Sequence, residues 1–225
     1  MVNSIHQRIW TPDMGVRYHH AGRQMPWWKA GGTACIWAAY QADSAANFAA
    51  SLVDLSGNGN DAGDPGGAAT PGWDAVNGWT FDGVNQYLTT AFIPESDQSQ
   101  SMIVQFTDFA GGDILGIAEG GVAFTLGSNE TDATYFNGGG LSAAPILASG
   151  IQAVAGDKGY RNGVLDVTGL AGWGMVVPTY NCYIGAVHWL GGAGCDSVKI
   201  QKAAFYSCAL TGPQVLAITT AMEIA

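Results

Sequence analysis

Residues 158–167 read Lys-Gly-Tyr-Arg-Asn-Gly-Val-Leu-Asp-Val, and this stretch decides the fold class. Asn162-Gly163 lies between two short segments whose side chains alternate in character. Asn-Gly is a favoured pair for the two-residue type I′ turn, because both central positions of that turn have a positive φ. The stretch therefore predicts a β-hairpin.

The rest of the chain repeats this pattern of short apolar runs between turn residues. Thirty-three glycines and eight prolines punctuate the sequence, which is typical of many strands joined by tight turns. Further strands are expected at residues 34–40, 51–54, 79–83, 86–90, 101–106, 113–118, 122–126, 134–136, 180–186 and 197–206. Segments 79–83 and 86–90 alternate around a short turn, as the two arms of a hairpin do.

One helix is expected near the end of the sequence. Thr211 is a suitable N-cap and Pro213 fits the first turn, so residues 212–222 should form the only substantial helix. A chain of 225 residues accommodates a single β-sandwich. We therefore expect an all-β fold: a two-sheet antiparallel jelly-roll sandwich with an extended N-terminal arm and one short C-terminal helix.

The charge divides the chain at residue 33. The net charge is −10, yet residues 1–33 hold four basic residues and only one acidic residue, whereas residues 34–225 hold four basic and seventeen acidic ones. An acidic body repels nucleic acid and anionic membranes, which are bound through clustered Lys and Arg. These partners are therefore excluded, and residues 1–33 are predicted to be a docking arm on a domain spanning 34–225.

The N-terminus and the cysteines suggest a cytoplasmic origin. Met1 to Trp10 lacks the apolar stretch of a secretory signal, and no apolar run has the length of a membrane span. The chain is thus expected to be made in a host cytoplasm. Its four cysteines, Cys35, Cys182, Cys195 and Cys208, lack zinc-site spacing, and free thiols are favoured over disulfides in a reducing compartment.

Four segments appear in the order found in one superfamily of jelly rolls. They are Asp54–Asp61 (D-L-S-G-N-G-N-D), Trp79–Leu88 (W-T-F-D-G-V-N-Q-Y-L), Gly159–Leu165 (G-Y-R-N-G-V-L) and Ala203–Ile218 (A-A-F-Y-S-C-A-L-T-G-P-Q-V-L-A-I). The sequence resembles the concanavalin A-like lectin/glucanase superfamily, particularly its laminin-G-like and pentraxin-like members. The resemblance implies two stacked antiparallel sheets. The resemblance implies little about function, but such domains are common in bacteriophage tail, fibre and capsid-decorating proteins, where a short N-terminal segment attaches the module. The basic, aromatic arm fits that arrangement.

No catalytic constellation is evident in the sequence. Glucanases of this superfamily carry E-x-D-x-E or E-x-D-x-x-E along one strand, and the nearest approach here is Glu95-Ser96-Asp97-Gln98-Ser99-Gln100. Gln100 can act neither as an acid nor as a carboxylate nucleophile. The only histidine of the body, His188, is expected to be a packed residue. The protein is therefore predicted not to be an enzyme and to need no cofactor.

Two candidate binding sites in the sequence each have a simpler structural interpretation. Four oxygen-bearing side chains gather in one predicted turn: Asp54, Asn58, Asn60 and Asp61. They could bind calcium, but hydrogen bonds within their own turn are the favoured interpretation. Trp173 and Trp189 lie in glycine-rich segments and are candidate sugar platforms, with a place in the core as the favoured alternative.

The arm residues are the strongest candidates for docking on a partner. They are Trp10, Arg17, Arg23, Trp27, Trp28 and Lys29. Trp and Arg are over-represented at interface hot spots, and the alternative is that these aromatic residues pack back onto their own sandwich. We therefore expect a non-enzymatic structural or accessory virion protein that docks on other virion proteins and forms homo-oligomers. Contact with host surface carbohydrate is a further expectation, and a free-standing lectin is the alternative, ahead of a glycoside hydrolase.

Overall fold

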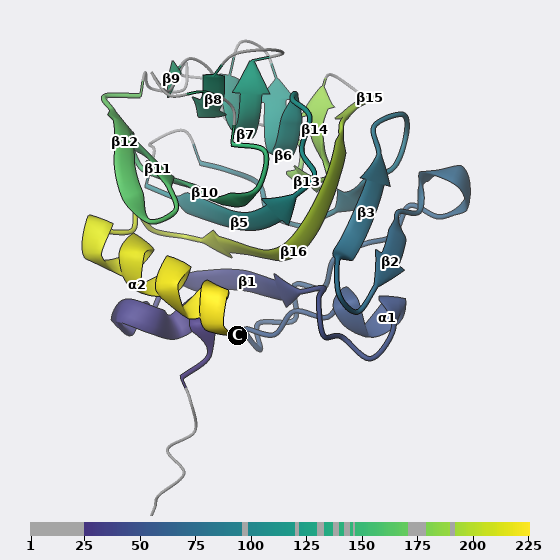
Figure 1. The fold of residues 1–225 in the computed structure, drawn as a ribbon, viewed down its shortest axis with the longest axis horizontal. Coiled ribbons are helices and arrows are strands. Elements are labelled where there is room, and N and C mark those ends of the chain that lie inside the picture. The colour runs from purple at the N-terminus through teal and green to yellow at the C-terminus, as the bar shows by residue number, and fades with distance from the viewer. Residues whose placement is uncertain are drawn as a thin grey trace, which may run out of the picture.

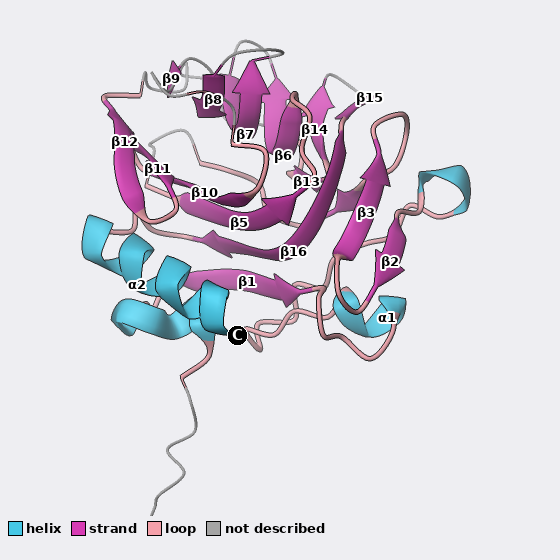
Figure 2. Cartoon of the chain, viewed as in Figure 1, coloured by secondary structure: helices cyan, strands magenta, loops and turns pink. Residues whose placement is uncertain are grey.

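Two β-sheets stack face to face, and a helix and a 3₁₀ segment cover the outer face of one of them (Figure 1). This computed structural model describes residues 25–95, 99–119, 122–129, 133–136, 140–141, 145, 147–170, 179–189 and 192–225. Strands dominate these residues (Figure 2). The predicted all-β, two-sheet sandwich with one short C-terminal helix is confirmed.

Sheet A contains eight strands. They are β1 (Ile36–Gln41), β2 (Gly72–Asp74), β3 (Gly78–Asp82), β5 (Ser101–Thr107), β10 (Gly150–Ala155), β11 (Lys158–Arg161), β12 (Val164–Thr168) and β16 (Ser197–Tyr206). Their order is β12-β11-β10-β5-β16-β3-β2, with β1 also paired to β16. Every pairing in this sheet is antiparallel.

Sheet B also contains eight strands. They are β4 (Leu88–Thr89), β6 (Asp113–Glu119), β7 (Val122–Asn129), β8 (Ala133–Phe136), β9 (Gly140–Leu141), β13 (Tyr183–Ile184), β14 (Ala186–Trp189) and β15 (Gly192–Cys195). The main path is β15-β14-β6-β7-β8-β9, and β13 pairs with both β4 and β6. Within the described part of this sheet, β14 and β6 are parallel and the other pairs are antiparallel.

The helical elements are short except for the last one. They are η1 (Trp27–Gly32), α1 (Phe48–Ser51), η2 (Gly67–Ala69) and α2 (Gly212–Ile224). Thr211 and Gln214 form a capping box at the start of α2, with Pro213 in its first turn, so the helix begins where its sequence predicts. Among the described residues, no helix is long and apolar enough to span a membrane.

The central strands of sheet A, β1, β5, β10 and β16, are buried on both faces, which explains their mainly apolar sequences. In β5, Met102 and Val104 enter the core between the two sheets, whereas Ile103 enters a second core beneath α2 and η1. β16 divides its side chains in the same way: Phe205 lies between the sheets and Tyr206 lies under the helix. Successive side chains point to opposite faces of a strand, so each strand supplies two cores.

The predicted hairpin is confirmed. β11 and β12 are antiparallel neighbours, and Asn162 and Gly163 between them have φ values of 49° and 76°. These values fit the type I′ turn, whose central residues both occupy the left-handed region.

Three strand predictions were wrong in detail. Residues 51–54 do not form a strand, because Asn47 caps the short helix α1 and the chain then turns. Segments 79–83 and 86–90 are not hairpin arms, since β3 belongs to sheet A and β4 to sheet B. The expected strand at 180–186 is broken at Gly185, with φ of 79°, into β13 and β14.

The C-terminal part of the predicted arm packs against its own domain. Trp27 is 3% exposed and belongs to the core beneath α2, and its Nε1 donates a hydrogen bond to Oε1 of Gln41. Burial of this ring under the helix does not agree with a docking role for Trp27 and favours the alternative of packing back onto the sandwich. Residues 1–24 lie outside the described residues.

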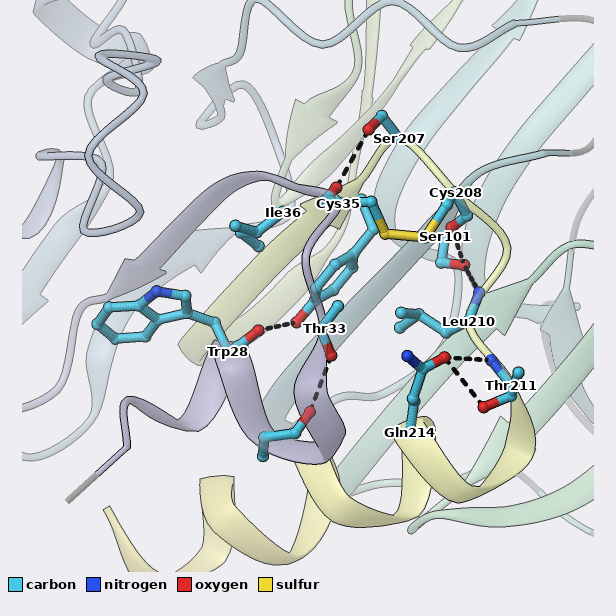
Figure 3. Close-up of a disulfide and its surroundings, with 12 residues drawn as sticks. Trp28, Thr33, Cys35, Ile36, Ser101, Ser207, Cys208, Leu210, Thr211 and Gln214 are labelled. Atoms are coloured by element: carbon cyan, nitrogen blue, oxygen red, sulfur yellow. Dashed lines mark hydrogen bonds between the residues drawn. A yellow bond between two sulfur atoms is a disulfide. The ribbon is translucent and has the colours of Figure 1, made fainter.

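Two of the cysteines form a disulfide, which corrects the expectation of free thiols. Cys35 precedes β1 and Cys208 follows β16, and antiparallel pairing of these strands brings the two Cα atoms to 5.9 Å (Figure 3). The backbone N–H of Ser207 also donates to the carbonyl oxygen of Cys35. Cys182 and Cys195 are free.

Candidate functional site

Four aromatic side chains form a continuous cluster on sheet B. Tyr87 stacks on Tyr183 with ring centroids 4.5 Å apart, and Tyr183 stacks on His188 at 4.3 Å with nearly parallel planes. Tyr180 lies tilted against His188 at 4.6 Å. Tyr180 is 40% exposed, whereas His188 is 7% exposed, so the cluster joins a buried support to an exposed ring.

Strand alternation places the tyrosines away from the core. Leu88 follows Tyr87 and Ile184 follows Tyr183, and both aliphatic residues are fully buried between the sheets. Because neighbouring residues of a strand face opposite sides, the two tyrosines point outward. The antiparallel pair β4 and β13 then sets Leu88 opposite Ile184 and brings the flanking tyrosines into contact.

The support of the cluster is fixed by polar as well as ring contacts. His188 Nδ1 lies 3.2 Å from the carbonyl oxygen of Asn181, which holds the loop carrying Tyr180 against the imidazole. Burial, followed by the neighbouring Tyr87, raises the pKa of Tyr183. The phenol is therefore neutral at physiological pH, and its ring offers an uncharged surface.

A second feature is an open acidic pocket of about 390 Å³ at the C-terminal end of β3. Its lining comes from Asp82, Gly83, the loop 110–112, Asp196 and Ser197. Asp196 Oδ2 accepts a hydrogen bond of 2.7 Å from the backbone N–H of Asp113. Burial and the neighbouring Asp196 carboxylate raise the pKa of Asp113 to about 7, and burial raises the pKa of Asp196.

Two of the predicted docking residues lie on the side of the domain away from the aromatic cluster. Trp28 and Lys29 lie in η1 on the outer side of sheet A, in the layer opposite the aromatic cluster. Trp189 ends β14, one residue after His188, but its side chain is outside the described part. The remaining predicted residues, Trp10, Arg17, Arg23 and Trp173, also lie outside it.

The candidate calcium turn is stabilised by its own hydrogen bonds. Asp54 accepts hydrogen bonds from the backbone N–H groups of Ala39, Ser56 and Asn60, and Asp61 accepts one from the N–H of Asp54. These bonds lower the pKa of Asp54 although burial opposes them. The carboxylates therefore have the turn-stabilising role that the sequence favoured.

The candidate glucanase segment also has a structural role. Gln100 is 5% exposed, and its Oε1 accepts a 2.8 Å hydrogen bond from the backbone N–H of Glu95. Asp97 lies outside the described residues. Gln100 therefore fixes the turn before β5.

Sequence reasoning missed the aromatic cluster because its members come from distant segments. Tyr87 lies 93 or more positions from the other three rings in the chain. The available signal was the alternation Tyr-Leu at 87–88 and Tyr-Ile at 183–184, which marks an outward aromatic residue beside an inward aliphatic one. Their proximity depends on the pairing of β4 with β13, which a local pattern does not reveal.

Comparison with solved structures defines the chain as a β-sandwich of a widespread architecture. It superposes on Trypanosoma rangeli sialidase in complex with 2,3-difluorosialic acid with a TM-score of 0.54 and 18% identity, covering 85% of this chain and 34% of the sialidase chain. It also superposes on the binding domain of botulinum neurotoxin serotype D with a TM-score of 0.56 and 12% identity, covering 84% of this chain and 51% of that one.

These likenesses show the fold alone. The chain spans about a third of the sialidase and half of the neurotoxin domain. Neither a family model nor a curated protein matches the sequence.

Proposed function

We propose that the chain is a non-catalytic carbohydrate-binding module with a laminin-G-like jelly roll. The observation that carries the proposal is the aromatic cluster of Tyr87, Tyr180, Tyr183 and His188. Flat aromatic faces pack against the apolar C–H faces of sugar rings, and tyrosine adds a hydroxyl for hydrogen bonding. A fold shared with a sialidase that was solved with sialic acid is compatible with this use.

The absence of catalysis is part of the same proposal. Asp113 and Asp196 are neighbouring carboxyl residues in the described part of the chain. Asp196 accepts a hydrogen bond from the backbone N–H of Asp113, so the pair has a structural role in joining β6 to the segment before β16. The adjoining pocket is lined by small and acidic residues and not by aromatic ones, so it offers no sugar platform.

A glycan panel tests both statements. Wild type should bind at least one immobilised oligosaccharide. Tyr180→Ala should weaken that binding roughly tenfold, whereas Leu216→Ala, at an exposed position of α2, should keep it. The same panel should show no released sugar. Absence of binding across the panel would refute the binding role, and turnover that disappears in Asp113→Asn would refute the non-catalytic role.

We infer that the module is carried on a bacteriophage particle as a homo-oligomer, contacts host carbohydrate and holds no resident metal. The charge of segment 1–24 supports the inference, since this segment contains Arg8, Arg17 and Arg23 but only one acidic residue, Asp13. Mass spectrometry of purified virions against cell lysate tests it, because a protein confined to the lysate contradicts attachment.

A further inference from the structure

The strands of sheet B contain no Lys or Arg residue. The chain has no Lys or Arg from Ala30 to Asp157 or from Asn162 to Val198, and every strand of sheet B falls within these two intervals. The acidic residues are not excluded in the same way, since β6 begins at Asp113 and ends at Glu119. The strands that carry the aromatic cluster therefore contribute no Lys or Arg to it.

The four cations of residues 34–225, Lys158, Arg161, Lys199 and Lys202, all lie in strands of sheet A, and the three lysines are paired with carboxylates. Lys158 contacts Asp157 at 2.6 Å, Lys199 contacts Asp108 at 2.7 Å, and buried Lys202 contacts Asp43 at 3.3 Å. All three lysines belong to β11 or β16 of sheet A. An anionic ligand at the aromatic cluster would thus meet an uncompensated acidic body.

We infer that the aromatic cluster binds uncharged glycans and rejects glycans carrying sialic or uronic acid. The inference rests on the proposed carbohydrate-binding function and adds the ligand class. Desolvating a carboxylate without a positive partner is costly, whereas a neutral sugar needs only ring stacking and hydroxyl hydrogen bonds. The expected specificity therefore differs from that of the sialidase with which the chain shares its fold.

The exposure of the rings divides the cluster into contact and support residues. Tyr180 is the most exposed of the four and Tyr87 forms the other end of the stack. Tyr183 lies between Tyr87 and His188, so its two faces are occupied by these rings. Tyr180 and Tyr87 are the residues that contact sugar, and Tyr183 and His188 are positioning residues.

The experiment compares matched pairs of oligosaccharides that differ only by a terminal sialic or uronic acid. Wild type should bind the neutral member at least roughly tenfold more tightly than the acidic member, because one unfavourable contact of this kind costs a factor of that order. Binding of the neutral member should be the same at 50 and 500 mM NaCl, since screening acts on charges. Tighter binding of the acidic oligosaccharides would overturn the inferred preference for neutral glycans while leaving the carbohydrate-binding function intact. Failure to bind neutral and acidic oligosaccharides alike would overturn the preference and the carbohydrate-binding function together.

Variants separate stacking from charge. Tyr180→Ala should weaken neutral-glycan binding roughly tenfold, whereas Tyr180→Phe, which keeps the ring, should retain most of it. Thr179→Lys adds a cation beside Tyr180 at an exposed position and should raise relative binding of the acidic members. An unchanged preference in Thr179→Lys, with its fold verified by circular dichroism, would overturn charge as the cause of selectivity.

Discussion

Replacing Asp113 by Asn should remove a pH-dependent loss of stability. The pKa of Asp113 is about 7 in the folded protein against an ordinary value of 3.8. Because the folded-state pKa is raised, folding favours the protonated carboxyl. The contribution of Asp113 to the free energy of unfolding is therefore most favourable below pH 4 and becomes less favourable as the pH rises to 7. A difference of about three pH units corresponds to at most about 4 kcal/mol, and partial solvent contact reduces this to roughly 1–4 kcal/mol.

Urea unfolding followed by tryptophan fluorescence at pH 5, 6, 7 and 8 measures the effect. The free energy of unfolding of Asp113→Asn minus that of wild type should grow by roughly 1–3 kcal/mol between pH 5 and pH 8, because about two of the three pH units of the shift lie above pH 5. Glu223→Gln on the exposed side of α2 is the matched control and should show no such trend. An equal difference between Asp113→Asn and wild type at all four pH values would refute the electrostatic reasoning.

Three further predictions concern the framework of the domain. Removing residues 1–24 should leave the free energy of unfolding nearly unchanged. Removing residues 1–33 should lower it by about 3–5 kcal/mol, because the buried side chain of Trp27 is lost. Equal stability of the two truncated proteins would contradict a structural role for Trp27. Cys35→Ser should cost at most about 5 kcal/mol, because the disulfide closes a loop with a sequence separation of 173, and denatured unreduced wild type should expose two thiols and not four. Gly163→Ala should cost about 1–2 kcal/mol of stability, because Gly163 has a φ of 76° and an added Cβ would contact Leu216. Gly57→Ala is the control for backbone strain alone, since Gly57 also has a positive φ but lies in open space. An equal loss of stability in both variants would contradict the contribution of the Leu216 contact.

Local signals predicted the parts of the fold that depend on neighbouring residues. The Asn162-Gly163 turn and the Thr211 cap each act over a few positions, and both were placed from the sequence. The partners of β3 and β4 could not be placed in this way, because the pairing of β4 with β13 joins residues about 95 positions apart. Trp27 was assigned to an arm for the same reason: the helix that buries it lies almost two hundred residues later.

The candidate site was less predictable than the fold. Tryptophan content directed attention to Trp173 and Trp189, whereas the described cluster consists of tyrosines and one histidine. Its two main tyrosines are adjacent only because a pair of two-residue strands align. The absence of Lys and Arg from the same surface was visible in the sequence, but its meaning depends on knowing which strands form sheet B.

The two ends of the described chain lie together on one side of the domain. Met25 and Ala225 line one groove of about 390 Å³ together with Trp28 and Ile224, on the side of sheet A that faces away from sheet B (Figure 1). A surface or tag joined through Ala225 is therefore held behind the sandwich, on the side of sheet A. The aromatic cluster then points away from that attachment, and immobilisation through Ala225 leaves the cluster open to solution.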